Sequence, residues 1–108
     1  KMKKVHVTID RPLGSRHPKH HSTIYPINYG YVAGIIGGDG DYQDAYIIGV
    51  DKPIDSFDGF VIAVVHRKDD NETKWIVAAE GLHPTIEEIE KAIEFQEKFY
   101  NSSIEMIK

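Results

Sequence analysis

The chain has 108 residues, which is enough for one modest core, and we expect residues 1–108 to form a single domain. Hydrophobic residues make up 41% and charged residues 28%, as in ordinary globular proteins, and the lack of cysteine excludes disulfides, zinc–thiolate sites and cysteine nucleophiles. The formal net charge of −4 gives no general attraction to nucleic acid. The longest apolar run, residues 60–65, is far shorter than the ~20 residues of a membrane-spanning helix. Because no secretory signal follows the Lys-rich start, we expect a cytoplasmic protein that binds neither nucleic acid nor membrane.

Strand patterns occupy the chain up to residue 79. Val5, Val7 and Ile9 alternate with polar residues, as in a half-buried strand, and the Pro-, Gly-, Ser- and His-rich segment 11–23 has the composition of a loop. An extended aromatic segment follows at 25–31, and a cluster of glycines then marks a tight turn region at 34–40. Further strands are expected at residues 45–50, 60–66 and 75–79, with a hairpin turn at 69–73 between the last two.

The end of the chain has helical periodicity. Thr85 and Glu88 match a capping box, and apolar residues recur near helical spacing, which predicts a helix over residues 86–100 with a solvated Glu/Lys face. Together these elements predict a mainly β or α+β fold, namely a small OB-like antiparallel β-barrel with one C-terminal helix packed on it.

The hexapeptide 39–44 (DGDYQD) carries the strongest local signal for chemistry. Three converging carboxylates would repel one another, and a hard divalent cation removes that penalty because it prefers oxygen ligands. The alternative is a surface turn whose side chains point into water. A calcium EF-hand loop is excluded, because its sixth position would be Asp44 instead of glycine and its twelfth Val50 instead of glutamate.

A wider pattern surrounds this hexapeptide. Residues 25–31 (YPINYGY) precede it by a short glycine-rich stretch, Lys19 follows Asp10 by nine residues, and Glu72-x-Lys74 ends an acidic turn before a strand. In this order and spacing the chain resembles the soluble (family I) inorganic pyrophosphatases, closely over residues 10–74 and loosely in the C-terminal helix. The resemblance implies hydrolysis of inorganic diphosphate to two orthophosphates with Mg²⁺, and a homo-oligomer.

The resemblance also implies residue roles. Asp41 would be the general base, with Tyr29 hydrogen-bonded nearby, and Lys19 and Lys74 would hold phosphate oxygens. The metal ligands would be Asp39, Asp44 and Glu72 for the activating ions, and Asp10 with Asp69 or Asp70 for ions that arrive with substrate.

Two departures from the family pattern concern the phosphate side of the site. The family's arginine-bearing hairpin is missing, because only five residues separate Lys19 from Tyr25. Arg16, Arg11 and Arg67 are candidates to replace that arginine; the sequence does not choose among them, and Arg16 is included in the candidate substrate site. The family's helical Tyr-Lys pair falls on Phe99 and Tyr100, so both polar groups are lost or displaced.

Other interpretations remain open at this level. The shortened site can act on another small phosphoanhydride, or the chain can be a barrel that binds metal and phosphate without turnover. An OB-type single-strand binder would use Tyr25, Tyr29 and Tyr31 as stacking platforms, although the acidic balance argues against it. The histidines at 17, 20 and 21 fit an anion-binding loop or solvent-facing residues better than a zinc site.

Overall fold

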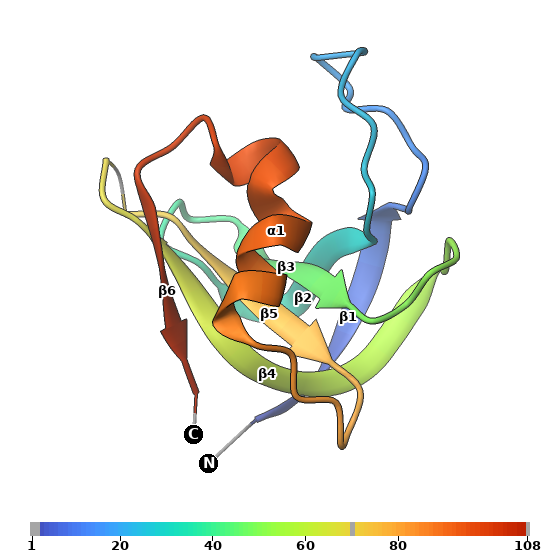
Figure 1. The fold of residues 1–108 in the computed structure, drawn as a ribbon, viewed down its shortest axis with the longest axis vertical. Coiled ribbons are helices and arrows are strands. Elements are labelled where there is room, and N and C mark those ends of the chain that lie inside the picture. Colours follow the sequence, from blue (N-terminus) through green and yellow to red (C-terminus); the bar gives the residue numbers. More distant parts are fainter. Residues whose placement is uncertain (1–2, 70, 108) are drawn as a thin grey trace.

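The computed structural model describes residues 3–69 and 71–107. Over these residues it contains six strands and one helix (Figure 1). In chain order they are β1 (Lys4–Arg11), β2 (Tyr29–Ile36), β3 (Tyr42–Ile48), β4 (Ser56–Arg67), β5 (Thr73–Ala78), α1 (Ile86–Glu97) and β6 (Ser102–Met106). None of the described residues belongs to a helix with the length and apolar character needed to cross a membrane.

The strands β1 to β5 close into a barrel. Their order is β1-β2-β3-β5-β4, and β4 also pairs with β1. Closure depends on the length and curvature of β4 (Figure 1): residues 56–60 of this strand pair with β1, while residues 63–67 pair with β6. The small barrel with a C-terminal helix is therefore confirmed.

One strand pair departs from a purely antiparallel arrangement. β3 and β5 run parallel, with Asp44 paired with Lys74, whereas the remaining pairs in the described sheet are antiparallel. The reason is topological, because β5 lies between β3 and β4, which run in opposite directions. Whichever direction β5 takes, it must be parallel to one of them, and the short turn from β4 makes it antiparallel to β4.

The buried residues form two clusters. One draws on all five barrel strands through residues such as Val7, Val32, Ile47, Val61 and Val77, and is therefore the barrel interior. The other joins the outside of the barrel to α1, where buried Ile89 and Ile93 meet the strand residues Tyr46, Ile62 and Ile76. β3 and β5 are covered on both faces, so their buried residues run consecutively instead of alternating.

The helix and its surroundings differ in detail from the sequence prediction. Thr85 caps α1 and forms the expected capping box with Glu88, but the helix ends at Glu97, three residues before residue 100. Strand β6 follows and was not predicted, because only Ser102 and Ile104 within it are even partly buried. β2 continues to Ile36 with an irregularity after Val32, where Gly34 adopts a φ of 85°, so part of the predicted turn region is strand.

Candidate functional site

Charged side chains from several elements line one cavity of about 310 Å³, which we call the carboxylate pocket. Its acidic residues are Asp10, Asp39, Asp41, Asp44 and Glu72, and its cationic residues are Arg11, Arg67 and Lys74. Five carboxylates against three cationic side chains leave an excess of negative charge among the described lining residues. This excess favours a metal cation.

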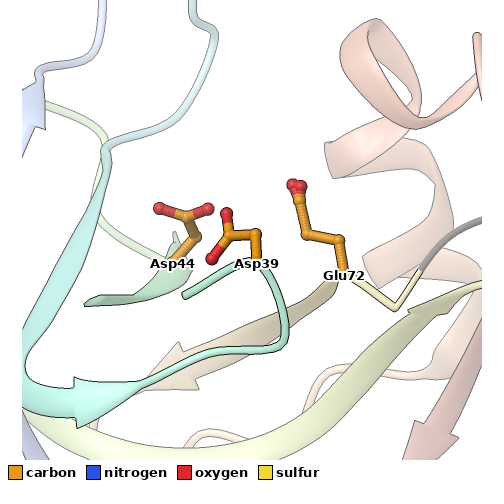
Figure 2. Close-up of side chains that lie close together, drawn as sticks. All are labelled: Asp39, Asp44 and Glu72. Carbon is orange, nitrogen blue, oxygen red and sulfur yellow. The ribbon is translucent and has the colours of Figure 1, made fainter. Parts of the chain in front are cut away.

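Three of these carboxylates approach one another closely. Asp39, Asp44 and Glu72 each offer an oxygen, and these oxygens lie within 4.8 Å of one another (Figure 2). They come from separate segments: the turn after β2, strand β3, and the turn before β5. No other group of three or more metal-ligating side chains occurs among residues 3–69 and 71–107.

A glycine allows two of these segments to approach. Gly38 lies beside the turn before β5, and a Cβ atom added to it would overlap the backbone carbonyl oxygen of Asn71. Asp39 follows Gly38 directly and Glu72 follows Asn71. The absence of a side chain at residue 38 therefore brings the Asp39 turn against the Glu72 turn.

Lys74 lies at the centre of the pocket. Its buried Nζ donates to Asp44 Oδ2 at 2.6 Å, to Tyr29 Oη at 2.9 Å and to Glu72 Oε1 at 3.0 Å. Burial alone would lower the pKa of Lys74, but Tyr29 and the hydrogen bonds to Asp44 and Tyr29 raise the pKa above its ordinary value. Lys74 is therefore an ammonium at neutral pH and offsets the charge of two of the three clustered carboxylates.

Arg67 enters the pocket from the end of β4 and is held by Glu97. Its Nε donates to Glu97 Oε1 at 3.1 Å and its Nη2 to Glu97 Oε2 at 2.7 Å, while Nη1 donates to Glu72 at 3.2 Å. The ring of Tyr100 packs on the guanidinium, with 3.7 Å between Cζ and the ring centroid. This contact fixes the planar fork of Arg67 beside the carboxylate cluster.

Glu97 is itself tightly enclosed, so the prediction that the Glu/Lys face of the helix is solvated is wrong for this residue. It is 6% exposed and also accepts hydrogen bonds from Tyr46 Oη at 2.6 Å and Ser102 Oγ at 2.7 Å. Burial would raise the pKa of Glu97, but the bonds from Arg67, Tyr46 and Ser102 lower the pKa below its ordinary value. The unpredicted strand β6 supplies Ser102, which is why the sequence did not reveal this environment.

The proposed base and its neighbour also line the pocket. Asp41 is exposed, and its backbone N donates to Asp39 Oδ1 at 3.0 Å, which links the two aspartates within one turn. Tyr29 is buried, and burial raises the pKa of its phenol, so the hydroxyl stays protonated at neutral pH. Partial desolvation also raises the pKa of Asp10, with a contribution from the charge of Asp44 that Arg11 opposes.

Three further predicted residues, Arg16, Lys19 and Asp69, do not line this pocket. Arg16 donates from Nη1 to His21 O at 2.8 Å within the 12–24 loop, and Lys19 is exposed on the same loop. Asp69 accepts from the backbone N of Asn101 at 3.3 Å, and Asp70 lies outside the described residues. The Arg16–Ile24 bridge closes the loop on itself, and neither Arg16 nor Lys19 is among the residues that line the carboxylate pocket.

Arg11 is the other cation that the structure brings to the pocket. Its Nη1 donates to Tyr25 Oη at 2.6 Å, and its Cζ lies 5.6 Å from the ring centroid of Tyr29. It is the last residue of β1, directly after Asp10. Its position beside a candidate metal ligand is the feature of the sequence that could have assigned Arg11 to the site.

Within the part of the chain that the structure describes, the three histidines of the loop belong to no group of side chains that could hold a metal ion. The Nδ1 of His17 accepts hydrogen bonds from the backbone N of Lys19 and of His20, at 3.1 and 3.2 Å. Burial and the charge of Arg11 lower the pKa of His17, so the ring is neutral at pH 7. His17 therefore shapes the loop and forms a neutral wall of the pocket.

Comparison with known proteins relates this fold to solved structures. No protein-family model and no curated protein matches the sequence. The inorganic pyrophosphatase of Ehrlichia chaffeensis superposes with a TM-score of 0.72 at 15% identity, over 97% of this chain and 86% of that chain. The inorganic pyrophosphatase of Neisseria gonorrhoeae superposes with a TM-score of 0.68 at 16% identity, over 95% of this chain and 82% of that chain. For the inorganic pyrophosphatase of Helicobacter pylori the TM-score is 0.64 at 16% identity, over 97% of this chain and 82% of that chain. The chain therefore has the fold of these inorganic pyrophosphatases.

Proposed function

We propose that this chain is a Mg²⁺-dependent hydrolase that cleaves inorganic diphosphate into two orthophosphates. The observation that carries the proposal is the approach of the Asp39, Asp44 and Glu72 oxygens to within 4.8 Å beside the ammonium of Lys74. This arrangement occurs in a fold shared with inorganic pyrophosphatases. It agrees with the roles that the sequence resemblance implies for the same residues.

The donor set fits a hard divalent cation. All three groups are carboxylates, their spacing is close to that of ligands around one cation, and the pocket has excess negative charge. Asp39, Asp44 and Glu72 would hold the activating metal, and Asp10 would serve an ion that arrives with substrate. Bound Mg²⁺ would neutralise phosphate charge and would lower the pKa of a bound water, which makes that water a better nucleophile at neutral pH.

The residues of the pocket then have complementary tasks in hydrolysis. Asp41 accepts a proton from the attacking water, and the protonated hydroxyl of Tyr29 orients the reacting groups beside Lys74. The water oxygen forms a bond to one phosphorus as the bridging P–O bond breaks, and the departing orthophosphate keeps the bridging oxygen. Lys74 and the neighbouring arginines offset the charge that develops on that oxygen.

We assign the phosphate contacts to Arg11 and Arg67 in preference to Arg16 and Lys19. Both arginines line the carboxylate pocket, whereas Arg16 donates within its own loop and Lys19 is exposed outside the pocket. Arg67 is already oriented by Glu97, and a planar guanidinium suits phosphate oxygens. Lys19 would contact substrate only after a movement of the 12–24 loop.

The single-strand-binding alternative is disfavoured by burial. Tyr25 and Tyr29 are 0% and 5% exposed, so their faces cannot stack on bases. A non-catalytic barrel that binds metal and phosphate is the remaining rival from another class. We further propose a cytoplasmic homo-oligomer, in which exposed apolar residues such as Ile36 and Tyr42 would be covered.

Phosphate release separates the enzyme from the rival. Purified protein is incubated with diphosphate in Mg²⁺, in Mn²⁺, and with an excess of EDTA. We expect metal-dependent release of two orthophosphates per diphosphate. Release at the background rate in both Mg²⁺ and Mn²⁺, from folded protein that still binds the metal, would establish the non-catalytic barrel instead.

A further inference from the structure

A second cavity, which we call the aromatic cavity, lies between the 17–23 loop and the C-terminal end of α1. Its volume is about 440 Å³, which falls within the usual range for small-molecule sites. In Figure 1 the 12–24 loop projects beyond the barrel on the side toward which the C-terminal end of α1 points. The loop contributes His17, His20, Ser22 and Thr23 to the lining, and the helix end contributes aromatic residues.

Flat side chains dominate this cavity. The rings of His17 and His20 lie 4.9 Å apart between centroids, and Phe95, Phe99 and Tyr100 complete the aromatic part of the lining. Phe99 is 70% exposed, the largest exposed fraction among the large hydrophobic residues described. Because so much aromatic surface costs free energy in water, these rings favour an apolar planar ligand.

The aromatic cavity adjoins the carboxylate pocket. His17, Gln96 and Tyr100 line both. Gln96 is fixed between them, because its Oε1 accepts from Tyr25 at 3.1 Å and its Nε2 donates to Tyr46 at 2.7 Å. Tyr100 packs against Arg67, which faces the carboxylates. A ligand in the aromatic cavity therefore lies next to the groups that bind metal and phosphate.

Inorganic diphosphate has no apolar surface and makes no use of this cavity. We propose that the aromatic cavity binds the base of a nucleoside triphosphate, while its phosphates enter the carboxylate pocket. The inference rests on the proposed function, since it extends the substrate range of the same site. Water attacks the terminal phosphorus and the adjacent bridging P–O bond breaks. The nucleoside diphosphate retains the bridging oxygen, and orthophosphate is released.

Comparing ATP with inorganic triphosphate isolates the contribution of the base, because the two carry the same number of phosphoryl groups. We expect kcat/KM for ATP to exceed that for inorganic triphosphate by about tenfold in Mg²⁺, since base–aromatic stacking is worth roughly 1–3 kcal/mol. Phe99→Ala should lower kcat/KM for ATP by about tenfold and leave the values for diphosphate and inorganic triphosphate unchanged. Phe99 is exposed, so the variant keeps the fold. Leu82→Ala, which removes an exposed apolar side chain from the turn after β5 and outside both cavities, is the control and should change none of the three values.

The outcomes separate this inference from the proposed function. If diphosphate is hydrolysed but ATP is no better than inorganic triphosphate, the inference is overturned and the diphosphatase proposal stands. If ATP is hydrolysed in a Phe99-dependent way and diphosphate is not, the diphosphatase proposal fails and the cavity assignment is supported.

If the chain hydrolyses neither diphosphate nor ATP, a direct measurement of ATP binding still tests the assignment of the aromatic cavity. ATP affinity is then measured by calorimetry in Mg²⁺. Weaker ATP binding by Phe99→Ala supports the cavity assignment, and no ATP binding by the unmodified chain overturns it. It is equally overturned if Phe99→Ala converts a dimer to a monomer without changing ATP affinity or hydrolysis, because a second copy of the chain would then be the occupant.

Discussion

Lys74 is bound to the same carboxylates that would hold the metal. Its Nζ donates to Asp44 and Glu72, and replacing it removes a positive charge from a buried position. For Lys74→Ala we expect kcat/KM for diphosphate to fall ten- to a hundredfold, since a hydrogen bond to a charged group is worth roughly 1.5–3 kcal/mol. Mg²⁺ affinity should stay equal or become tighter, because a competing cation has been removed.

Steady-state kinetics and calorimetry measure the two effects of Lys74→Ala separately. The matched control is Lys91→Ala, an exposed lysine on α1, which should change neither value. Weaker Mg²⁺ binding with unchanged kcat/KM would show that Lys74 supports the metal and does not contact phosphate.

Asp41 and Asp39 belong to one turn but have different proposed tasks. For Asp41→Asn we expect turnover to fall on the order of 10²–10⁴-fold through loss of the general base, with Mg²⁺ affinity retained. Asp39→Asn should instead weaken Mg²⁺ binding. The exposed Asp51→Asn serves as the control. Normal turnover of Asp41→Asn at saturating Mg²⁺ would remove Asp41 from the mechanism.

Ionisation of Glu97 makes the free energy of unfolding depend on pH. Its pKa in the folded chain lies below the ordinary value of 4.5, so near that pH the unfolded chain binds more protons than the folded one. Its contribution is therefore fully present above about pH 5 and is lost as the pH falls through the folded pKa. Glu97→Gln should lower the free energy of unfolding by about 3–5 kcal/mol at pH 7, because it leaves Arg67 without its charged partner.

Urea denaturation across pH 3–7 measures this difference. The loss on acidification should be smaller in Glu97→Gln than in the unmodified chain, while the exposed Glu94→Gln should follow the unmodified chain. Parallel curves for all three proteins would contradict the assigned role of Glu97.

Several residues of the site could be predicted from the sequence because they lie close together along the chain. Asp39, Asp41 and Asp44 share a hexapeptide, and Lys74 follows Glu72 by two residues. The role of Glu97 could not be predicted from the sequence, because its partners Arg67 and Tyr46 are 30 and 51 residues away along the chain. A helical glutamate in an amphipathic pattern gives no sign that it is buried against an arginine.

At the level of elements, the metal ligands depend on the approach of two turns. A Cβ atom at residue 38 would overlap the carbonyl of Asn71, so Gly38→Ala must separate the Asp39 turn from the Glu72 turn. We expect Mg²⁺ affinity and kcat/KM for diphosphate both to fall at least tenfold. Gly37→Ala is the control in the same turn, because its added Cβ would come no closer than 3.3 Å to any neighbouring atom, the nearest being the end of the Gln43 side chain.

The readouts for Gly38→Ala are calorimetry with Mg²⁺ and phosphate release, together with circular dichroism to verify the fold. Unchanged Mg²⁺ affinity in a folded Gly38→Ala variant would show that the two turns do not act as one site.

Elements with a clear hydrophobic period or a capping motif could be predicted from the sequence, whereas features defined by strand pairing could not. The alternation at Val5, Val7 and Ile9 and the capping box at Thr85 each determine local structure. The parallel pairing of β3 with β5 depends on which strand lies between which others. β6 pairs with the second half of β4 through its backbone and has little apolar pattern to reveal it.

On the scale of the whole molecule, barrel closure is what assembles the site. β1 ends with Asp10 and Arg11, β3 contains Asp44, and Lys74 is the second residue of β5. Closure of the sheet brings these charged side chains to one pocket. α1 and β6 then enclose Glu97, whose carboxylate accepts from Arg67 and holds that arginine in the lining of the pocket. We therefore propose that the closed barrel holds a metal ion between Asp39, Asp44 and Glu72.

Anomalous scattering from crystals soaked in Mn²⁺ would locate this ion, because manganese substitutes for Mg²⁺ at oxygen sites and can be identified by its own signal. We expect a manganese peak within coordination distance of carboxylate oxygens from Asp39, Asp44 and Glu72. The peak should disappear in crystals of Asp39→Asn prepared in the same way. A carboxylate pocket without manganese at saturating concentration, or a peak bound by other residues, would rule out the proposed metal site.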